Sequence, residues 1–428
     1  MRRNIGIFAL LMLVLMMLFV SCEAQPELPG NGNDVPPTVE EDAEINPLVG
    51  RWGFAEDRSA MFFEFTEYGT FTLSSYSELN PSIYTTAGRY DLNDDLVTLE
   101  TKELEDFIKT FEFSIDGNEL SISFVDADGT VEDEAILFFN IDEKKNDMHV
   151  DEDLLGKWIE QLDNSGLIFE FTSSGFVFVY RQFQSDDSNL ISELMAANTY
   201  TLDETKPGVI SIEGTESTYV FQEDGTVVIT GGNETLSFKQ YARDGESIEL
   251  TDLVGSYVGQ EGFELIIFED GSMLDFDENG EIYAEKLILD ITNEYIRFID
   301  QMYLDSDDKP FITVEFSMSI EDDSLTIADA KFTKVDDSTN FTLSGDFLRN
   351  NLIVYPKLEL KEDGTYAIYD NGLMTELLEE GKYSIVGNKV FVGDKTFVLR
   401  VEVRDKAYTH LYWVEEDVLL QDPTSIIG

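Results

Sequence analysis

LVGRWGFAEDRSAMFFEFTEYGTFTL, residues 48–73, contains a short motif that recurs three more times along the chain. The motif is Leu-x-Gly followed, one residue later, by an aromatic side chain. It reappears as LLGKW (154–158), LVGSY (253–257) and LSGDF (343–347). The copies start at intervals of about 100 residues, which is the size of a small domain. The sequence therefore predicts four tandem units of one fold.

Each motif is followed by the same predicted β-hairpin. Its copies read FFEFTEYGTFTL (62–73), IFEFTSSGFVFVY (168–180), LIIFEDGSMLDF (265–276) and LELKEDGTYAIY (358–369). Apolar and polar residues alternate on both sides of a turn that contains glycine, which is the pattern of strands with one buried face. In the second copy this pattern assigns Phe169 and Phe171, together with Phe176 and Phe178, to the buried face.

Further antiparallel strands are predicted downstream in each unit. A Gly-x-Tyr strand is clear at AGRYDL (87–92) and GKYSIV (381–386), and meanders such as FEFSIDGNELSISF (111–124) lie beyond the first hairpin. Two segments that precede this strand, 189–198 and 373–380, have an apolar spacing that suits a short helix. The predicted fold class is all-β: four tandem small antiparallel up-and-down β-barrels, each with a short helical insert.

These repeated features resemble the small lipocalin-like domains of secreted bacterial lipoproteins. In lipocalins the Gly-x-Trp motif lies on the first strand, and its tryptophan closes the floor of the barrel. The resemblance implies this role for the motif residues of all four units, with Tyr and Phe replacing Trp in the third and fourth. These residues are Gly50, Trp52, Gly156, Trp158, Gly255, Tyr257, Gly345 and Phe347. Whether each barrel is a hollow calyx or a filled barrel stays open at this point.

The N-terminus has the features of an export signal. Arg2 and Arg3 precede an apolar run, Ile5 to Val20, that is too short to cross a bilayer. LFVSC, which ends at Cys22, resembles the lipobox of bacterial lipoproteins, in which the cysteine is lipid-modified and becomes the new N-terminus; the alternative is a simple secretory peptide with an incidental cysteine. The resemblance implies that acyl chains such as palmitate on Cys22 anchor the exported protein to the bacterial cell envelope, where we expect the outer membrane.

The segment between the signal and the first motif is rich in Pro, Gly, Asn and acidic residues, so it has too little apolar surface to fold. It is predicted to be an acidic flexible tether. The predicted organisation is a lipoprotein signal peptide at 1–21, the tether at 22–46, and lipocalin-like repeats at 47–145, 150–245, 250–337 and 340–421.

Charge excludes some classes of partner. The chain has 87 Asp and Glu against 28 Lys and Arg, a formal net charge of −59, while hydrophobic residues make up 43%. This composition indicates a folded protein with an acidic surface that repels nucleic acid. The expected partners are the membrane, reached through the lipid anchor, and an envelope or extracellular molecule.

The sequence contains little that supports enzymatic chemistry. His149 and His410 are the only histidines, so a histidine-dependent triad or a His-rich metal site is nearly excluded. The chain has no Gly-x-Ser-x-Gly elbow, no phosphate-binding glycine loop and no His-Glu-x-x-His motif. We therefore expect a non-enzymatic protein without a cofactor.

One segment resembles part of a calcium-binding loop. Asp275, Asp277 and Asn279 with Gly280 follow the first positions of an EF-hand loop, but Lys286 stands where the bidentate Glu belongs. Asp-x-Asp-x-Asn-Gly is also a natural hairpin turn, and we favour that interpretation over calcium binding.

Two functions of different classes are compatible with the sequence. The first is non-enzymatic binding at the membrane surface, in which four similar modules engage a repetitive or multivalent partner. The alternative is carriage of a small lipophilic molecule inside one or more barrels, which the many aromatic residues would line. Filled barrels favour the first, and hollow barrels favour the second.

Overall fold

The computed structural model describes residues 46–421 apart from short internal segments. The segments outside the description are 57–58, 78–79, 102–107, 126–128, 133–134, 144–148, 162–164, 185–189, 213, 233, 242–247, 260–261, 302–310, 322, 329, 337–338, 350–355, 371–373, 375, 404–406 and 415–417. The predicted signal peptide, Cys22 and nearly all of the predicted tether also lie outside the described residues.

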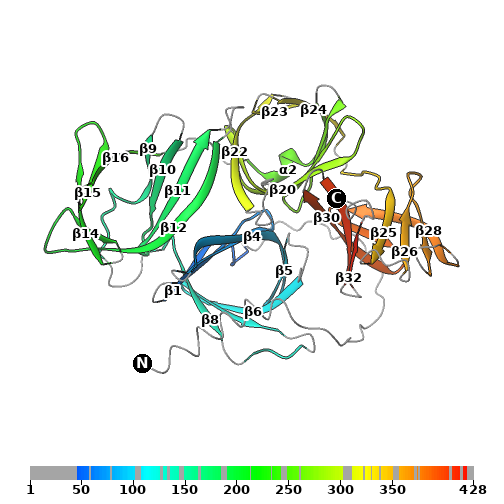
Figure 1. Ribbon diagram of the computed structural model, residues 1–428, viewed down its shortest axis with the longest axis horizontal. Helices are drawn as coiled ribbons and strands as arrows, with labels where there is room; N and C mark the ends of the chain where they lie inside the picture. Colours follow the sequence, from blue (N-terminus) through cyan, green and yellow to red (C-terminus); the bar gives the residue numbers. More distant parts are fainter. Residues whose placement is uncertain are drawn as a thin grey trace.

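Barrels 1 and 4 are closed sheets in which every strand pairs with its neighbour in sequence (Figure 1). They close by pairing their first and last strands, with Trp52 opposite Asn140 in barrel 1 and Leu348 opposite Gln421 in barrel 4. Barrel 1 consists of β1 (Gly50–Glu56), β2 (Ser59–Phe65), β3 (Thr70–Ser77), β4 (Asn80–Asn93), β5 (Leu96–Thr101), β6 (Ile108–Asp116), β7 (Glu119–Phe124) and β8 (Ile136–Asn140). Barrel 4 consists of β25 (Gly345–Arg349), β26 (Lys357–Leu360), β27 (Thr365–Tyr369), β28 (Leu377–Val386), β29 (Lys389–Val392), β30 (Lys395–Val403), β31 (Ala407–Trp413) and β32 (Val418–Gln421).

Barrels 2 and 3 have the same order of strands but share one continuous 16-stranded sheet. Each closes on itself, and β12 of barrel 2 also pairs with β22 of barrel 3, where Ile191 lies opposite Val314. Barrel 2 consists of β9 (Gly156–Gln161), β10 (Ser165–Phe171), β11 (Phe176–Gln184), β12 (Leu190–Leu202), β13 (Val209–Ile212), β14 (Thr215–Phe221), β15 (Thr226–Gly231) and β16 (Glu234–Gln240). Barrel 3 consists of β17 (Gly255–Gly259), β18 (Glu264–Ile267), β19 (Ser272–Phe276), β20 (Ile282–Ile291), β21 (Tyr295–Gln301), β22 (Phe311–Glu321), β23 (Ser324–Ile327) and β24 (Ala330–Asp336). The predicted class, four tandem up-and-down antiparallel barrels, is confirmed.

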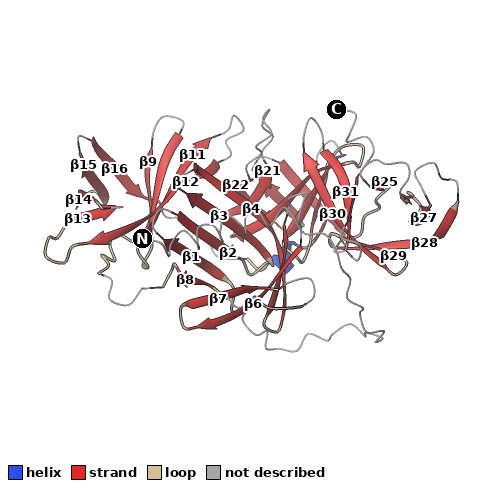
Figure 2. Cartoon of the chain, turned by 60° about the horizontal axis from the view of Figure 1, so that its bottom comes forward, coloured by secondary structure: helices blue, strands red, loops and turns tan. Residues whose placement is uncertain are grey.

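The predicted helical inserts are wrong. Within the segment 189–198 the described residues belong to β12, which pairs with β11, and residues 377–380 of the other segment belong to β28, which pairs with β27. Both strands are needed to close their barrels, and the backbone pairing overrides the weak local spacing signal. The one α-helix in the described part of the chain is the single turn α2 (Leu250–Leu253), which precedes β17 (Figure 2).

The glycine of the recurring motif has a backbone conformation that other residues rarely adopt. Its φ is 135° at Gly50, 98° at Gly156, 143° at Gly255 and 154° at Gly345. A side chain is disfavoured in this region, so glycine is required where the chain turns into the first strand of each barrel. This explains the Leu-x-Gly part of the motif.

In barrels 1, 2 and 3 the aromatic residue of the motif reaches back and donates a hydrogen bond to the carbonyl of the motif leucine. Trp52 Nε1 donates to the Leu48 carbonyl at 2.8 Å, and Trp158 Nε1 donates to the equivalent Leu154 carbonyl at 2.8 Å. In barrel 3 the hydroxyl of Tyr257 donates to the Leu253 carbonyl at 2.7 Å.

In barrel 4 the carbonyl of the motif leucine accepts its hydrogen bond from a different side chain. Phe347 has no donor, and the hydroxyl of Tyr383 on β28 donates to the Leu343 carbonyl at 2.6 Å. The leucine carbonyl is therefore satisfied in all four barrels, although the donor residue changes.

The barrel interiors contain packed aromatic and aliphatic side chains. In barrel 1, Phe63 and Phe65 of β2 pack with Trp52, Phe71 and Phe138 among others in one buried cluster. In barrel 2, Trp158 and Phe171 pack with Tyr200 and Phe238. Large side chains thus fill the space that alternation along each strand assigns to the core.

The expected buried face of the second hairpin is correct for β10 and wrong for β11. Phe169 and Phe171 point into barrel 2, and their partners across the hairpin are Val179 and Val177. Phe176 and Phe178 instead point outward and pack against Phe62 and Ile141 of barrel 1. Both faces of β11 are buried because a neighbouring barrel covers the outer one, so hydrophobicity alone does not identify the inward face.

The four barrels form one connected body. Barrels 1 and 3 lie in the middle, with barrel 2 on one side and barrel 4 on the other (Figure 1). Ala87 of barrel 1 packs on Leu287, Leu289 and Ile299 of barrel 3, and the cluster around Phe268 of barrel 3 continues into the core of barrel 4. Apolar contacts between barrels therefore join the repeats into one body.

Candidate functional site: a polar cavity between three barrels

A group of charged side chains lies where barrels 1, 2 and 3 meet. In barrel 1, Arg51 on β1 lies opposite Glu64 on β2, and in barrel 2, Lys157 on β9 lies opposite Glu170 on β10. These are equivalent positions in the two repeats: the basic residue stands between the motif glycine and tryptophan, so strand alternation turns it outward. Barrel 3 adds Arg297 from β21.

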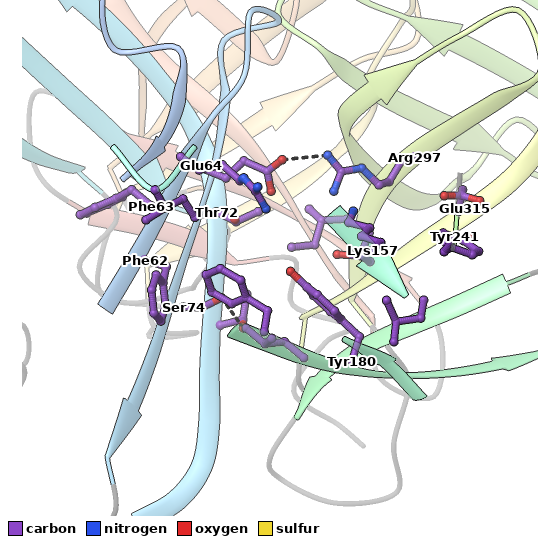
Figure 3. Close-up of a pocket in the computed structure, with 18 residues that line it drawn as sticks. Phe62, Phe63, Glu64, Thr72, Ser74, Lys157, Tyr180, Tyr241, Arg297 and Glu315 are labelled. Atoms are coloured by element: carbon purple, nitrogen blue, oxygen red, sulfur yellow. Dashed lines mark hydrogen bonds and ion pairs between the residues drawn. The ribbon is translucent and has the colours of Figure 1, made fainter. Parts of the chain in front are cut away.

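Ion pairs cross between the barrels at this junction. Arg51 Nη1 lies 2.7 Å from Glu170 Oε1 of barrel 2, and the same guanidinium also pairs with Asp142, through Nε at 3.0 Å. Arg297 Nη2 of barrel 3 lies 2.8 Å from Glu64 Oε1 of barrel 1 (Figure 3). Each carboxylate of barrels 1 and 2 thus pairs with an arginine of another barrel.

The electrostatic environment favours the ionised form of both glutamates. Burial alone would raise the pKa of Glu64, but Arg297 and then Arg51 hold that pKa below its ordinary value. Burial opposes ionisation of Glu170 in the same way, and Lys157 and Arg51 hold its pKa low. Both carboxylates are therefore charged at neutral pH, and both lie in a positive local potential.

Lys157 differs from the other cations of the junction. Within the described part of the chain its Nζ makes no hydrogen bond and no ion pair, and it lies 6.0 Å from the centroid of the Tyr180 ring. Burial lowers the pKa of Lys157; Glu170 counteracts this effect, while Arg297 and Arg51 add to it. Lys157 is half-buried. An ammonium that is partly withdrawn from water and has no acceptor among the described residues is disfavoured, so its presence calls for a physical reason.

A cavity of about 130 Å³ lies beside Lys157. In Figure 3 the lysine lies between Arg297 and Tyr180, with Glu315 and Tyr241 to one side. Part of the wall is apolar, and its members include Phe62, Ile141, Ile168, Phe178 and Leu194. The cavity therefore combines cationic groups with a hydrophobic wall, which is typical of sites for small amphiphilic molecules.

A second buried charged junction joins barrels 1, 3 and 4. Glu100 on β5 accepts from Arg400 Nη1 at 2.8 Å, from Asn388 Nδ2 at 2.8 Å and from Arg89 Nη1 at 3.4 Å. Arg89 also pairs with Glu285 and Asp270 of barrel 3. Burial opposes ionisation of Glu100, but Arg400 and Arg89 hold its pKa below the ordinary value.

The calcium candidate residues do not converge on one point. Asp275 lies on β19 and forms an ion pair with Lys286 of β20. The Asp277 carboxylate instead accepts from the backbone amides of Asn279 at 2.9 Å and Glu281 at 2.8 Å, as in an Asx turn. Among the described residues there is no group of three or more His, Cys, Asp or Glu that could hold a metal ion.

The two histidines lie apart from the cavity. His149 is exposed, with Nδ1 3.8 Å from a carboxylate oxygen of Glu204. His410 is completely buried on β31.

Sequence reasoning did not predict this cavity. Its charged residues stand in the recurring motif and hairpin, where they read as solvated outer positions of an acidic protein. One signal was present: Arg51 and Lys157 are basic at the same motif position, opposite Glu64 and Glu170, in a chain with only 28 basic residues.

Comparison with known proteins does not identify a relative. No known family matches the chain, and no curated protein matches it. Among solved structures, a DNA polymerase III β-subunit sliding clamp from Bartonella birtlesii aligns at 9% identity over 66% of this chain and 94% of that one, with a TM-score of 0.11. The WD40 domain of SCAP from fission yeast aligns at 11% identity over 83% and 93% (TM-score 0.12), and BamB from Moraxella catarrhalis at 11% over 78% and 96% (TM-score 0.10). Similarity this low supports no argument about fold or function.

Within the described residues, no helix has the length and hydrophobicity needed to cross a membrane.

Proposed function

We propose that this chain is a lipid-anchored protein of the bacterial cell envelope that uses four lipocalin-like barrels for non-enzymatic binding at the membrane surface. The observation that carries the proposal is the packing of the barrels: aromatic side chains occupy the interiors of barrels 1 and 2, and the cavity described above lies between barrels. Binding is therefore assigned to the outer faces and junctions of a fused body.

Because the barrels form one body, the four repeats contribute to binding differently from modules on a flexible string. In a flexible string, each module would add to the effective concentration of the others. Here the inter-barrel contacts of Phe62, Glu64 and Glu100 hold the four modules in one arrangement. The proposal is therefore that the body presents a preorganised surface, which lowers the entropy lost on binding.

The anchor is tested by replacing Cys22. Acylation at Cys22 predicts that the wild-type chain partitions into the detergent phase of a Triton X-114 extraction and that Cys22→Ser stays in the aqueous phase. Equal partitioning of both would overturn the anchor.

The binding mode is tested by native mass spectrometry. Residues 23–428 are purified from the native host and weighed before and after organic extraction. We expect the mass of the polypeptide alone. A stoichiometric lipophilic adduct that is lost on extraction would overturn surface binding in favour of the alternative function, carriage of a lipophilic molecule inside a barrel.

A further inference from the structure

Three cations line the cavity between barrels 1, 2 and 3, and Lys157 is the one for which the described residues provide no ion pair. Arg51 is paired with Glu170 and Asp142, and Arg297 is paired with Glu64. Lys157 makes neither a hydrogen bond nor an ion pair with any residue that the structure describes. A half-buried ammonium in this state favours an acceptor that arrives from outside the chain.

The local potential favours an anion as that acceptor. The pKa values of Glu64 and Glu170 both lie below their ordinary value in spite of burial. Arg297 and then Arg51 lower the pKa of Glu64, and Lys157 and then Arg51 lower that of Glu170. An anion beside Lys157 would experience the same cations. This positive region is unusual in a chain whose formal net charge is −59.

The walls restrict the size and charge of the ligand. The volume of about 130 Å³ is close to the roughly 150 Å³ of an apolar cavity that binds benzene, so it suits a ligand of about six heavy atoms. Phe62, Ile168 and Phe178 offer an apolar surface on one side. Glu64 and Glu315 also line the cavity and would repel a second negative charge, which favours a monoanion over a dianion.

We propose that this cavity is a binding site for a short-chain monocarboxylate, whose carboxylate accepts a hydrogen bond from Lys157 Nζ and whose alkyl chain lies against Phe62, Ile168 and Phe178. A charge-assisted hydrogen bond of this kind is stronger than one between neutral groups. A small amine would place a second cation beside Lys157, and a neutral molecule would leave the ammonium without a counter-charge. This inference deepens the proposed function by naming a ligand class for one junction between the barrels. It does not require the lipid anchor or a partner of the outer surface, so the titration below can fail while the anchor and surface binding hold.

The test is calorimetric titration of the full-length chain, in detergent at neutral pH, with butyrate as the probe. We expect saturable binding with one site per chain, and weaker or no binding of octanoate, which exceeds the cavity. Lys157→Met keeps the length of the side chain and removes the charge, and we expect it to weaken butyrate binding by about tenfold or more. The matched control is Lys331→Met, an exposed lysine on β24, which should bind as the wild type does.

A second variant tests the cavity without changing Lys157. Leu194 lines the cavity, so Leu194→Phe should fill it and abolish butyrate binding. Unfolding curves of each variant establish that it is folded. Absence of butyrate binding to the wild type, or equal binding by Lys157→Met, would overturn the proposal, as would equal affinity for butyrate and octanoate.

The pH dependence of butyrate affinity distinguishes a binding role of Lys157 from a purely structural one. The groups that face Lys157 are Arg51 and Glu64 from barrel 1, Glu170, Tyr180 and Tyr241 from barrel 2, and Arg297 and Glu315 from barrel 3. Because the pKa of Lys157 lies below its ordinary value, we expect butyrate affinity to fall as the pH rises through it, with proton uptake on binding. Affinity that stays constant across the alkaline range would contradict the role of the ammonium.

Discussion

The two charged junctions place ionised side chains between barrels, but they differ in how completely those charges are paired. At the junction of barrels 1, 3 and 4, Glu100 accepts from Arg89, Asn388 and Arg400, and Arg400 is only 1% exposed. At the junction of barrels 1, 2 and 3, Lys157 lies beside a cavity, and the described residues provide no hydrogen-bond acceptor for its ammonium group. The Glu100 cluster, whose carboxylate accepts three hydrogen bonds, holds barrels together. The Lys157 cluster, in which the described residues leave one cation without an ion pair beside a cavity, is suited to binding a ligand.

The comparison predicts that the Glu100 junction is the more sensitive to loss of a charge. Glu100→Gln would leave Arg400 and Arg89 buried with less negative charge beside them, and we expect the free energy of unfolding to fall by about 4 kcal/mol. Urea unfolding followed by tryptophan fluorescence measures this, because Trp52 reports on barrel 1 and Trp413 on barrel 4.

The control for this change is Glu112→Gln, an exposed glutamate on β6 of the same barrel, which should change stability by no more than about 0.5 kcal/mol. Equal effects of the two substitutions would mean that the Glu100 cluster does not hold the barrels.

The apolar side of the cavity junction predicts the next largest effect. Phe62 packs edge-to-face on Phe178, with ring centroids 4.7 Å apart, and on Phe176 at 5.2 Å. Phe62→Ala should cost about 3 kcal/mol and separate the unfolding transitions reported by Trp52 and Trp158. Phe391→Ala, at an exposed position on β29, is the matched control. A single unchanged transition in Phe62→Ala would show that this contact does not couple the barrels.

Acid should weaken both junctions. The pKa values of Glu64, Glu100 and Glu170 are held below the ordinary value of 4.5, so the folded state releases their protons more readily than the unfolded state. Their stabilisation is complete above that value and is lost as the pH falls through the lower folded-state pKa values.

Urea unfolding at a series of pH values from neutral to about pH 3 measures this loss. Glu100→Gln should show a shallower decline than the wild type, since one of the three carboxyls no longer titrates. An identical decline in both proteins would contradict the lowered pKa of Glu100.

The smallest change in the free energy of unfolding is expected at Lys157, and here the substitution should stabilise the protein. Lys157→Met removes a half-buried charge that has no acceptor among the described residues, so stability at neutral pH should rise by up to about 1 kcal/mol. In the wild type the folded-state pKa of Lys157 lies below the ordinary 10.5, so the penalty fades and stability rises as the pH increases between these values.

Lys157→Met should lack that alkaline increase, which urea unfolding at several alkaline pH values would reveal. A loss of stability comparable to that of Glu100→Gln would mean that Lys157 is a structural member of its junction.

Much of the fold was accessible from local patterns. The motif glycine, the alternating hairpins and the recurrence every hundred residues or so predicted four up-and-down barrels. The short helices at 189–198 and 373–380 were wrong because β12 and β28 take part in long-range strand pairing. Tyr383, which donates to the Leu343 carbonyl in barrel 4 in place of a motif aromatic residue, was not predicted because it stands far from Leu343 in sequence.

The sequence by itself determined the repeat, the class of each unit and the inward face of strands such as β2, because a period of two is a local property of a strand with one buried face. Tertiary structure alone decided which outward faces meet. Phe62, Glu64 and Lys157 all point away from their own barrels, and the docking of neighbouring barrels buries Phe62 and partly covers the other two. That docking depends on contacts between residues far apart in the chain, so no local pattern encodes the cavity that it creates.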